Sequence, residues 1–326
     1  MPKKALITGI TGQAGSYLAE HLLDEGYEVH GIVRPARDPD QSWISHLCRD
    51  PAVFGHRLFL HQGDVLEPAT LRRALNHTAP DEVYHLAGQS HVGLSFQLPE
   101  VTCGANALGT LRLLEMLRDL PRPPRLFQAS SAEIFGRPAS APQDETTPVA
   151  PVTPYGCAMA FSLHLTRVYR DTYGLFACCG ILYNHESPRR AETFVTRKIC
   201  RAAAAIKRGR QSELILGDLE AERDWGHARD YVRAMRLMLQ QPRPGDYVVA
   251  TGQLHKVREA VQIAFDQVQL DWRQFVRHDP RLLRPAEPGR LVGNPARAQR
   301  ELGWQPTTSF EALIREMTEA ELRALD

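Results

Sequence analysis

The sequence carries almost no net charge and has no long apolar segment. Its 326 residues contain 39 Lys and Arg against 38 Asp and Glu, so the formal net charge at neutral pH is +1. A chain so close to neutrality has no strong positive electrostatic field that would attract nucleic acid or an acidic membrane, and we expect neither as a partner. No segment approaches the ~18 apolar residues of a membrane-spanning helix. The apolar run after the N-terminal lysines is too short for a secretory leader, so we expect none.

Cysteine is also scarce and scattered. The six cysteines form no C-x-x-C pair, and in a chain of this length we expect free thiols in a reducing, cytoplasmic compartment. The adjacent Cys178 and Cys179 lie in an apolar run and are predicted to be core residues. The 13 histidines show no grouping at metal-ligand spacing. The sequence therefore predicts no metal site.

What the sequence does have is an alternation of short apolar runs and helical patterns up to about Tyr183. This rhythm predicts the α/β class, with a Rossmann-type doubly wound parallel sheet and a smaller C-terminal substrate-binding lobe. We expect residues 1–183 plus roughly 223–252 to form the main domain, and residues 184–222 plus 253–326 to form the lobe. The expected strands are Lys4–Thr8, Glu28–Val33, Leu58–Gln62, Glu82–Leu86, Arg125–Ser130 and Leu175–Leu182, and the main expected helices are Ser16–Glu25, Glu67–Asn76, Ala105–Leu117, Tyr155–Tyr173 and Phe194–Arg208.

A glycine-rich turn joins the first expected strand to the first helix. Gly9, Gly12 and Gly15 are spaced so that backbone N–H groups can approach a pyrophosphate at the positive end of that helix. Because a strand precedes the turn and a helix follows it, we interpret it as a dinucleotide-binding turn rather than a plain tight turn. Thr11 and Gln13 are expected to contribute further contacts.

The end of the second expected strand indicates which dinucleotide binds. An NAD-specific protein usually has an acidic residue there for the ribose diol, whereas this chain has Arg34 and Arg37. Arginine favours a 2′-phosphate, so the predicted cofactor is NADP; the alternative is that both arginines are solvated loop residues. Residues after the third and fourth strands are expected to line the rest of the cofactor: Asp64, Val65, Leu86, Ala87 and Gln89.

Two further segments carry residues suited to chemistry. Ser131 and Glu133 stand at the end of the fifth expected strand, and Tyr155 opens a helix about 20 residues later. Together with the glycine turn, these segments are similar to those of extended short-chain dehydrogenases/reductases. The chain most closely resembles the GDP-mannose 4,6-dehydratase family, and the segments 184–190, 194–198 and 223–226 carry the more specific part of that resemblance.

The resemblance implies a lyase that works by an internal redox cycle. NADP oxidises C4 of the hexose of GDP-mannose or a similar sugar nucleotide, water is eliminated across C5–C6, and the hydride returns to C6. Tyr155 takes the C4 hydroxyl proton, Ser131 hydrogen-bonds the same oxygen, and Glu133 serves the C5 proton and the leaving water. The residue types fit, because a C4 ketone acidifies the C5–H bond and a carboxylate can then act as general base. The resemblance also implies a homodimer or homotetramer.

One residue departs sharply from the family pattern. The pattern Tyr-x-x-x-Lys requires a lysine four residues after Tyr155, and this chain has Met159. That lysine would lower the pKa of the tyrosine and hold the nicotinamide ribose. Its loss would raise the activation free energy by up to ~4 kcal/mol, which slows the reaction about a thousandfold. Three interpretations stay open: an engineered change, a natural relative with slow or altered chemistry, and a catalytically silent binding protein. Further departures at Ala14, Pro35 and Ala191 favour a natural divergent member.

A sugar nucleotide also needs donors for its diphosphate and a polar edge for its base. The resemblance implies that the substrate-binding residues are Ser90, Asn184, Glu186, Arg190, Val195, Lys198, Arg223, Arg284 and Glu287. Other reactions on the same scaffold remain alternatives: a 5,6-dehydratase of a nucleoside or sugar nucleotide, an epimerase or a reductase. Glu133 favours elimination or epimerisation over reduction, because only those need a base for a carbon-bound proton. A non-catalytic NADP- or nucleotide-binding protein is the alternative from another class.

Overall fold

The centre of the molecule is one parallel β-sheet of seven strands. The structure is a computed structural model that describes residues 2–35, 38–282 and 289–326. The strand order is β11-β6-β5-β4-β1-β2-β3, so the chain winds one way from β1 and the other way from β4. This reversal leaves a crevice at the carboxyl ends of β1 and β4. The strands are β1 (Lys4–Thr8), β2 (Glu28–Val33), β3 (Leu58–Gln62), β4 (Glu82–His85), β5 (Arg125–Ser131), β6 (Ala177–Leu182) and β11 (Asp246–Val249).

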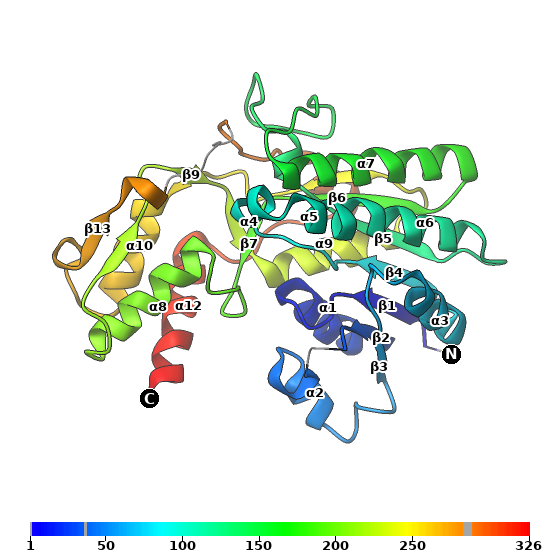
Figure 1. Ribbon diagram of the computed structural model, residues 1–326, viewed down its shortest axis with the longest axis horizontal. Helices are drawn as coiled ribbons and strands as arrows, with labels where there is room; N and C mark the ends of the chain where they lie inside the picture. Colours follow the sequence, from blue (N-terminus) through cyan, green and yellow to red (C-terminus); the bar gives the residue numbers. More distant parts are fainter. Residues whose placement is uncertain (1, 36–37, 283–288) are drawn as a thin grey trace.

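Helices cover both faces of this sheet (Figure 1). Helices α1 (Gln13–Asp24) and α9 (Ala228–Gln240) pack on one face, and α9 is the segment expected to return to the sheet. Helices α3 (Pro68–Thr78), α6 (Gly109–Arg118) and α7 (Pro154–Tyr173) pack on the other. The predicted Rossmann-type architecture is therefore confirmed.

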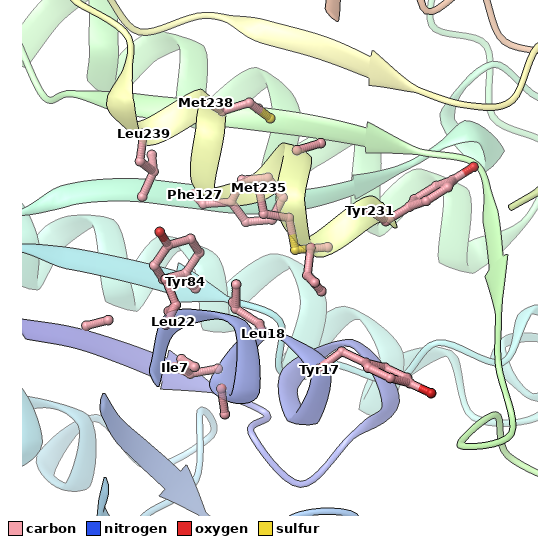
Figure 2. Close-up of a cluster of buried hydrophobic side chains, with 14 of the residues drawn as sticks. Ile7, Tyr17, Leu18, Leu22, Tyr84, Phe127, Tyr231, Met235, Met238 and Leu239 are labelled. Atoms are coloured by element: carbon pink, nitrogen blue, oxygen red, sulfur yellow. The ribbon is translucent and has the colours of Figure 1, made fainter. Parts of the chain in front are cut away.

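Figure 2 shows the buried core between the sheet and the α1–α9 layer. Leu18 and Leu22 are one turn apart on α1 and fully buried, as are Met235 and Met238 on α9. Each such side chain contributes roughly 1.5–3 kcal/mol through its burial. The sheet supplies Ile7, Tyr84 and Phe127 to the same cluster. Helix α1 is thereby fixed on the sheet, and with it the glycine turn from which it starts.

A second core holds the C-terminal lobe together, at the left of Figure 1. It lies among α8 (Val195–Lys207), α10 (Val257–Gln267) and α12 (Phe310–Leu325). Trp225 is 3% exposed and stacks on Phe310 with ring centroids 5.5 Å apart. Three two-stranded pairs complete the lobe and its junction: β7 (Asn184–Glu186) with β10 (Trp225–His227), β9 (Glu222–Arg223) with β12 (His255–Lys256), and β8 (Leu214–Leu216) with β13 (Val276–His278).

The connection between β4 and β5 is more divided than the single helix expected from Ala105. It contains α4 (Val92–Gln97), α5 (Pro99–Cys103) and a π-helical turn (Gly104–Leu108) before α6 begins. The ring of His91 accepts a hydrogen bond from the backbone N–H of Leu94 and starts α4. Pro99 then interrupts the helix, because proline disfavours helical backbone at the residue before it. The remaining short helices are α2 (Ser45–Arg49) and α11 (Ala296–Leu302).

Candidate active site

The glycine turn lies at the carboxyl end of β1, in the crevice of the sheet. Gly9 has a φ of +77°, and a Cβ there would lie 3.0 Å from the backbone nitrogen of Ala87 after β4. A Cβ on Gly15 would lie 2.2 Å from the carbonyl oxygen of Gly9. Side chains are therefore excluded at both positions, and the backbone packs closely between β1, β4 and α1.

The first turn of α1 is open to an anion. Gly12 caps the helix without a side-chain hydrogen bond, so no side chain of the cap competes for the first N–H groups of α1. Free N–H groups and the helix dipole together favour a phosphate at this point. This cradle fits the pyrophosphate of a dinucleotide.

Gln13 has a different role from a simple cofactor contact. Its Nε2 donates to the carbonyl oxygen of His185 at 2.8 Å, and its Oε1 accepts from Oγ of Ser187 at 2.7 Å. The side chain thus ties the phosphate turn to the segment that begins with β7. In Figure 1, β7 lies between the main sheet and the left-hand lobe. Gln13 therefore links the cofactor cradle to the segment that leads into the lobe.

Ser131, Glu133 and Tyr155 come together at the end of β5. Ser131 is the last residue of that strand, and its hydroxyl accepts from the backbone N–H of Glu133 at 3.3 Å, which starts a 3₁₀ turn at Ala132–Ile134. The side-chain hydroxyl of Thr153 accepts from the backbone N–H of Gly156 at 2.9 Å and caps α7, which places Tyr155 in its first turn. The three predicted catalytic side chains thus share one corner of the crevice.

The phenol of Tyr155 is strongly biased toward its neutral form. Burial raises its pKa to about 12. The hydrogen bond with Ser131 and the charge of Arg190 work in the opposite direction, whereas the carboxylate of Glu133 raises the pKa further. The site therefore needs a cation if the phenolate is to be available near neutral pH.

Met159 occupies the position one turn after Tyr155. It is buried, and its Sδ accepts a hydrogen bond from Nδ2 of Asn106 at 3.4 Å. The orientation of that amide is fixed, because its Oδ1 accepts from the backbone N–H of Gln89 and its Nδ2 also donates to the Gln89 carbonyl. Position 159 thus holds a neutral thioether in a packed environment, as the sequence predicted, and no cation.

The other predicted cofactor residues follow the carboxyl ends of neighbouring strands. Leu86 and Ala87 donate their backbone N–H groups to Oγ1 of Thr8, both at 3.1 Å. Asp64 and the buried Val65 follow β3, and Arg34 is exposed directly after β2. Thr11 lies within the glycine turn, and Gln89 follows β4. Arg37 lies outside the described residues.

The predicted sugar-nucleotide residues gather around β7 and the start of α8. Glu186 is buried and accepts from Oγ1 of Thr196 at 2.5 Å, and its Oε2 lies 3.2 Å from Nε of Arg190. Lys198 donates to the carbonyl oxygen of Ile215 at 2.7 Å. Asn184, Val195 and Arg223 are half-buried nearby in β7, α8 and β9, and Ser90 is exposed after β4. Arg284 and Glu287 lie outside the described residues.

Lys198 also borders a hollow of about 480 Å³ between α8 and the strand β8. The same hollow is lined by acidic, basic and neutral polar side chains, among them Glu192, Arg201, Gln211, Ser212 and Glu213. Arg197, the residue before Lys198 on α8, forms an ion pair with Glu321 and holds α8 to α12.

Two residues that touch the site were not expected from the sequence. Asn106 lies in the π-helical turn and contacts Met159, and it is the one amide side chain in the apolar pattern from Ala105 to Leu117. Phe194 lies under the guanidinium of Arg190, 3.5 Å from its centre, and packs edge-on against His91. A polar residue inside an apolar helix pattern was the available signal for Asn106; no local signal marks Phe194.

Within residues 2–35, 38–282 and 289–326, no three His, Cys, Asp or Glu side chains are grouped so as to hold a metal ion. In the same residues, no helix has the length and apolarity needed to cross a membrane. Cys178 and Cys179 are both fully buried, as expected.

Comparisons with known proteins show the family of this chain. Residues 6–317 match the sequence model of the family described as GDP-mannose 4,6 dehydratase. The chain is 49% identical over 327 residues to GDP-mannose 4,6 dehydratase 2 of Arabidopsis thaliana, covering 98% of this chain and 87% of that protein. The dTDP-glucose 4,6-dehydratase DesIV of Streptomyces venezuelae, solved with NAD and TYD bound, has a TM-score of 0.86 at 26% identity, over 97% of this chain and 96% of DesIV. RMD from Pseudomonas aeruginosa, solved with NADPH, has a TM-score of 0.81 at 26% identity, over 99% of both chains. The predicted family is thereby confirmed: this chain belongs to the GDP-mannose 4,6-dehydratase family.

Proposed function

We propose that this protein is a lyase that converts GDP-mannose to its 4-keto-6-deoxy product with NADP. The observation that carries the proposal is the grouping of Ser131, Glu133 and Tyr155 in one corner of the crevice, beside a backbone cradle that fits a pyrophosphate. A base for a carbon-bound proton beside a tyrosine distinguishes elimination from simple carbonyl reduction. Family membership supplies the substrate class.

Gly9, Gly12 and Gly15 would hold the pyrophosphate, and Arg34 would meet the 2′-phosphate that distinguishes NADP from NAD. When bound, this cofactor supplies reversible hydride transfer, so none of it is consumed in a turnover. Asp64, Val65, Leu86 and Ala87 line the remaining strand ends. We assign the cofactor to residues 1–183 plus about 223–252.

The protein's own residues handle the protons. The ionised Tyr155 accepts the proton of the C4 hydroxyl, while Ser131 donates a hydrogen bond to the same oxygen. Once C4 is a ketone, Glu133 removes the proton from C5 and delivers it to the departing C6 hydroxyl, so that one water leaves. When C6 is reduced, C5 takes back one proton, and the proton that Tyr155 took from O4 makes good that loss through exchange with solvent. Tyr155 and Glu133 therefore end the turnover in the states in which they began.

The sugar nucleotide is expected to bind between the sheet and the lobe formed by residues 184–222 plus 253–326. Arg223 and Lys198 are suited to its phosphates. Glu186 and Arg190 bind each other and give this wall of the site a fixed charged pair. The Arabidopsis relative is named for GDP-mannose, which makes that the first substrate to test. We further propose a homo-oligomer, dimer or tetramer, in the cytoplasm.

Mass spectrometry of the sugar nucleotide tests the function directly. Purified protein is incubated with GDP-mannose and NADP in heavy water, and the expected product has lost one water and gained deuterium at C5. Glu133→Gln should abolish both changes, because it removes the base, while cofactor affinity measured by calorimetry stays within about twofold. Stoichiometric consumption of reduced cofactor would instead identify a reductase. Tight binding of NADP and GDP-mannose with no product at any pH would identify a non-catalytic binding protein and refute the proposal.

A further inference from the structure

We propose that Arg189 is a positioning residue that fastens residues 185–190 (the junction segment) to the first two turns of α1. Through this contact, binding of the cofactor at the start of α1 and binding of the sugar nucleotide beside the lobe strengthen each other. The inference rests on the proposed function, which assigns NADP to the glycine turn and a sugar nucleotide to the wall formed by Glu186 and Arg190. Arg189 acts by holding that wall in place.

Arg189 binds side chains on successive turns of α1. Its Nη1 donates to Oγ of Ser16 at 3.0 Å, and its Nη2 donates to Oε1 of Glu20 at 2.7 Å. The guanidinium carbon also lies 3.9 Å from the ring centroid of Tyr17. The side chains of Arg189 and Glu20 are 19% and 25% exposed, so water screens their attraction less than it would on an open surface. The guanidinium is therefore fixed on α1 in one geometry.

Further hydrogen bonds tie the junction segment to the residue that opens α1. Gln13 donates from Nε2 to the carbonyl oxygen of His185 at 2.8 Å and accepts from Oγ of Ser187 at 2.7 Å. The Ser187 hydroxyl also accepts from the backbone N–H of Arg189 at 3.0 Å. On α1 itself, the hydroxyl of Ser16 donates to the carbonyl oxygen of Gln13 at 2.9 Å. These bonds form one continuous network between α1 and the junction segment.

The far end of the junction segment is held by the lobe. The backbone carbonyl of Arg190 accepts from Nη1 of Arg197 on α8 at 2.7 Å, and Arg197 in turn pairs with Glu321 on α12. Within the segment, Nε of Arg190 lies 3.2 Å from Oε2 of the buried Glu186. Because α1 holds one end of the segment and the lobe holds the other, the contacts on α1 fix where Glu186 and Arg190 stand relative to the cofactor cradle.

Gln13 is the residue at which the two sites meet. It is the first residue of α1, and the opening N–H groups of a helix have no partner within it and are suited to a phosphate. A pyrophosphate there restrains the backbone of the residue whose side chain holds the junction segment. The bound cofactor thereby lowers the entropic cost of ordering that segment for the sugar nucleotide, and by linkage each ligand strengthens the other by the same factor. Arg189 supplies the remaining side-chain contacts with α1, so the coupling should weaken without it.

Hydrogen–deuterium exchange, measured by mass spectrometry with and without saturating NADP, tests the inference without any turnover. Peptides that cover residues 185–190 should exchange about tenfold more slowly when NADP is bound. In Arg189→Gln this NADP-dependent slowing should fall to about twofold or less. Arg189→Lys should give an intermediate value, because an ammonium lacks the fork that reaches both Ser16 and Glu20. Peptides that cover the glycine turn report cofactor binding and should be protected by NADP in every variant.

Arg236→Gln is the matched control. Arg236 pairs with Glu25 at the other end of α1, and its side chain is 22% exposed against 19% for Arg189. This variant removes an arginine of similar burial that also binds α1, but it leaves the contacts of the junction segment in place. Its NADP-dependent slowing should equal that of the wild type. Ser187→Ala is the second test variant if Arg189→Gln fails to fold. It removes the hydroxyl between Gln13 and the backbone of Arg189 and should also reduce the slowing.

Equal slowing in the wild type, Arg189→Gln and Ser187→Ala would overturn the inference, and so would the absence of slowing in the wild type. An equal loss of slowing in Arg236→Gln would reveal a general loss of stability and would overturn it as well.

Kinetics of the active enzyme provide a separate readout. Arg189→Gln should raise the KM for GDP-mannose about tenfold and change kcat by less than about twofold, because a residue that only positions the binding wall contributes uniform binding. Exchange differences without any product would sustain the role of Arg189 while refuting the proposed function. Product formed with an unchanged KM in Arg189→Gln would refute the role of Arg189 and leave the proposed function intact.

Discussion

Replacing Met159 with lysine should raise the dehydration rate at neutral pH by about a hundredfold. With its pKa raised to about 12, only about one Tyr155 phenol in 10⁵ is ionised near neutral pH. An ammonium about 5 Å from the phenol oxygen would stabilise the phenolate by ~3 kcal/mol at an effective dielectric constant of about 20, which lowers the pKa of Tyr155 by about two units. If the phenolate is the active form, the rate rises with its population.

Initial rates of water loss across the pH range where the protein is folded provide the assay. The active form is deprotonated, so log kcat should climb with unit slope below the pKa of Tyr155 and level off above it. The wild-type rate should still be climbing at the alkaline end. The Met159→Lys rate should lie above it at every pH and level off earlier. Met159→Leu is the matched control, because it removes the sulfur but adds no charge, and its profile should follow the wild type.

The result that would refute the reasoning is a wild-type rate that is already level at neutral pH and gains nothing from lysine. That outcome would mean that Tyr155 is ionised by another group or is not the base. Unfolding of the Met159→Lys protein could also explain an absent rate increase. Measuring its thermal midpoint and its affinity for NADP beside those of Met159→Leu excludes this explanation.

Further predictions concern the cradle and the sheet edge. Gly15→Ala places a Cβ 2.2 Å from the Gly9 carbonyl oxygen, so the turn must shift by about 1 Å and the affinity for NADP should fall by at least tenfold. In Gly12→Ala the nearest atom to the new Cβ is 3.2 Å away, so this variant should lose much less affinity. Calorimetry measures the NADP affinity of both variants. Asp246→Asn should cost ~3–5 kcal/mol in urea unfolding, because the buried carboxylate pairs with Arg167 and Arg170. Burial opposes ionisation of Asp246, but those two arginines hold its pKa below the ordinary value. Its stabilisation is therefore present above the unfolded-state pKa and lost in acid, so the gap between wild type and variant should narrow below about pH 4.

The parts of the fold that sequence patterns predicted are those specified by local residues. Each of the strands β1 to β6 is a short apolar run in the sequence, and the structure places these six strands within a few residues of the expected bounds. Strand β11 was not recognised as a strand, because Asp246–Val249 is only four residues long and follows the segment Gln241-Pro-Arg-Pro-Gly245. Its place is set by pairing with β6, more than 60 residues earlier in the chain. Such a strand exists because of its partner rather than its own pattern.

The same distinction holds within the site. The glycine turn was predictable because the strand, the turn and the helix are contiguous, so the backbone geometry is encoded locally. The contact between Asn106 and Met159 was not, because it joins residues 53 positions apart and depends on a π-helical turn. Arg189 pairs with Glu20 on α1, whereas the adjacent Arg190 pairs with Glu186. This difference is likewise a tertiary property, since two adjacent arginines look alike in a sequence.

The packing around Met159 bears on what the loss of a lysine means. Methionine and lysine share the same chain length up to their fourth side-chain atom, and lysine adds one nitrogen beyond it. The methionine Sδ corresponds to the lysine Cδ, so the cost of restoring lysine beside Asn106 is one weak N–H···S hydrogen bond. The surroundings thus accept either residue sterically, and the difference between them is the charge at the end of the chain. A site altered only in charge retains its geometry for the Glu133 step, and the family pattern assigns the missing ammonium two tasks: to lower the pKa of Tyr155 and to hold the nicotinamide ribose.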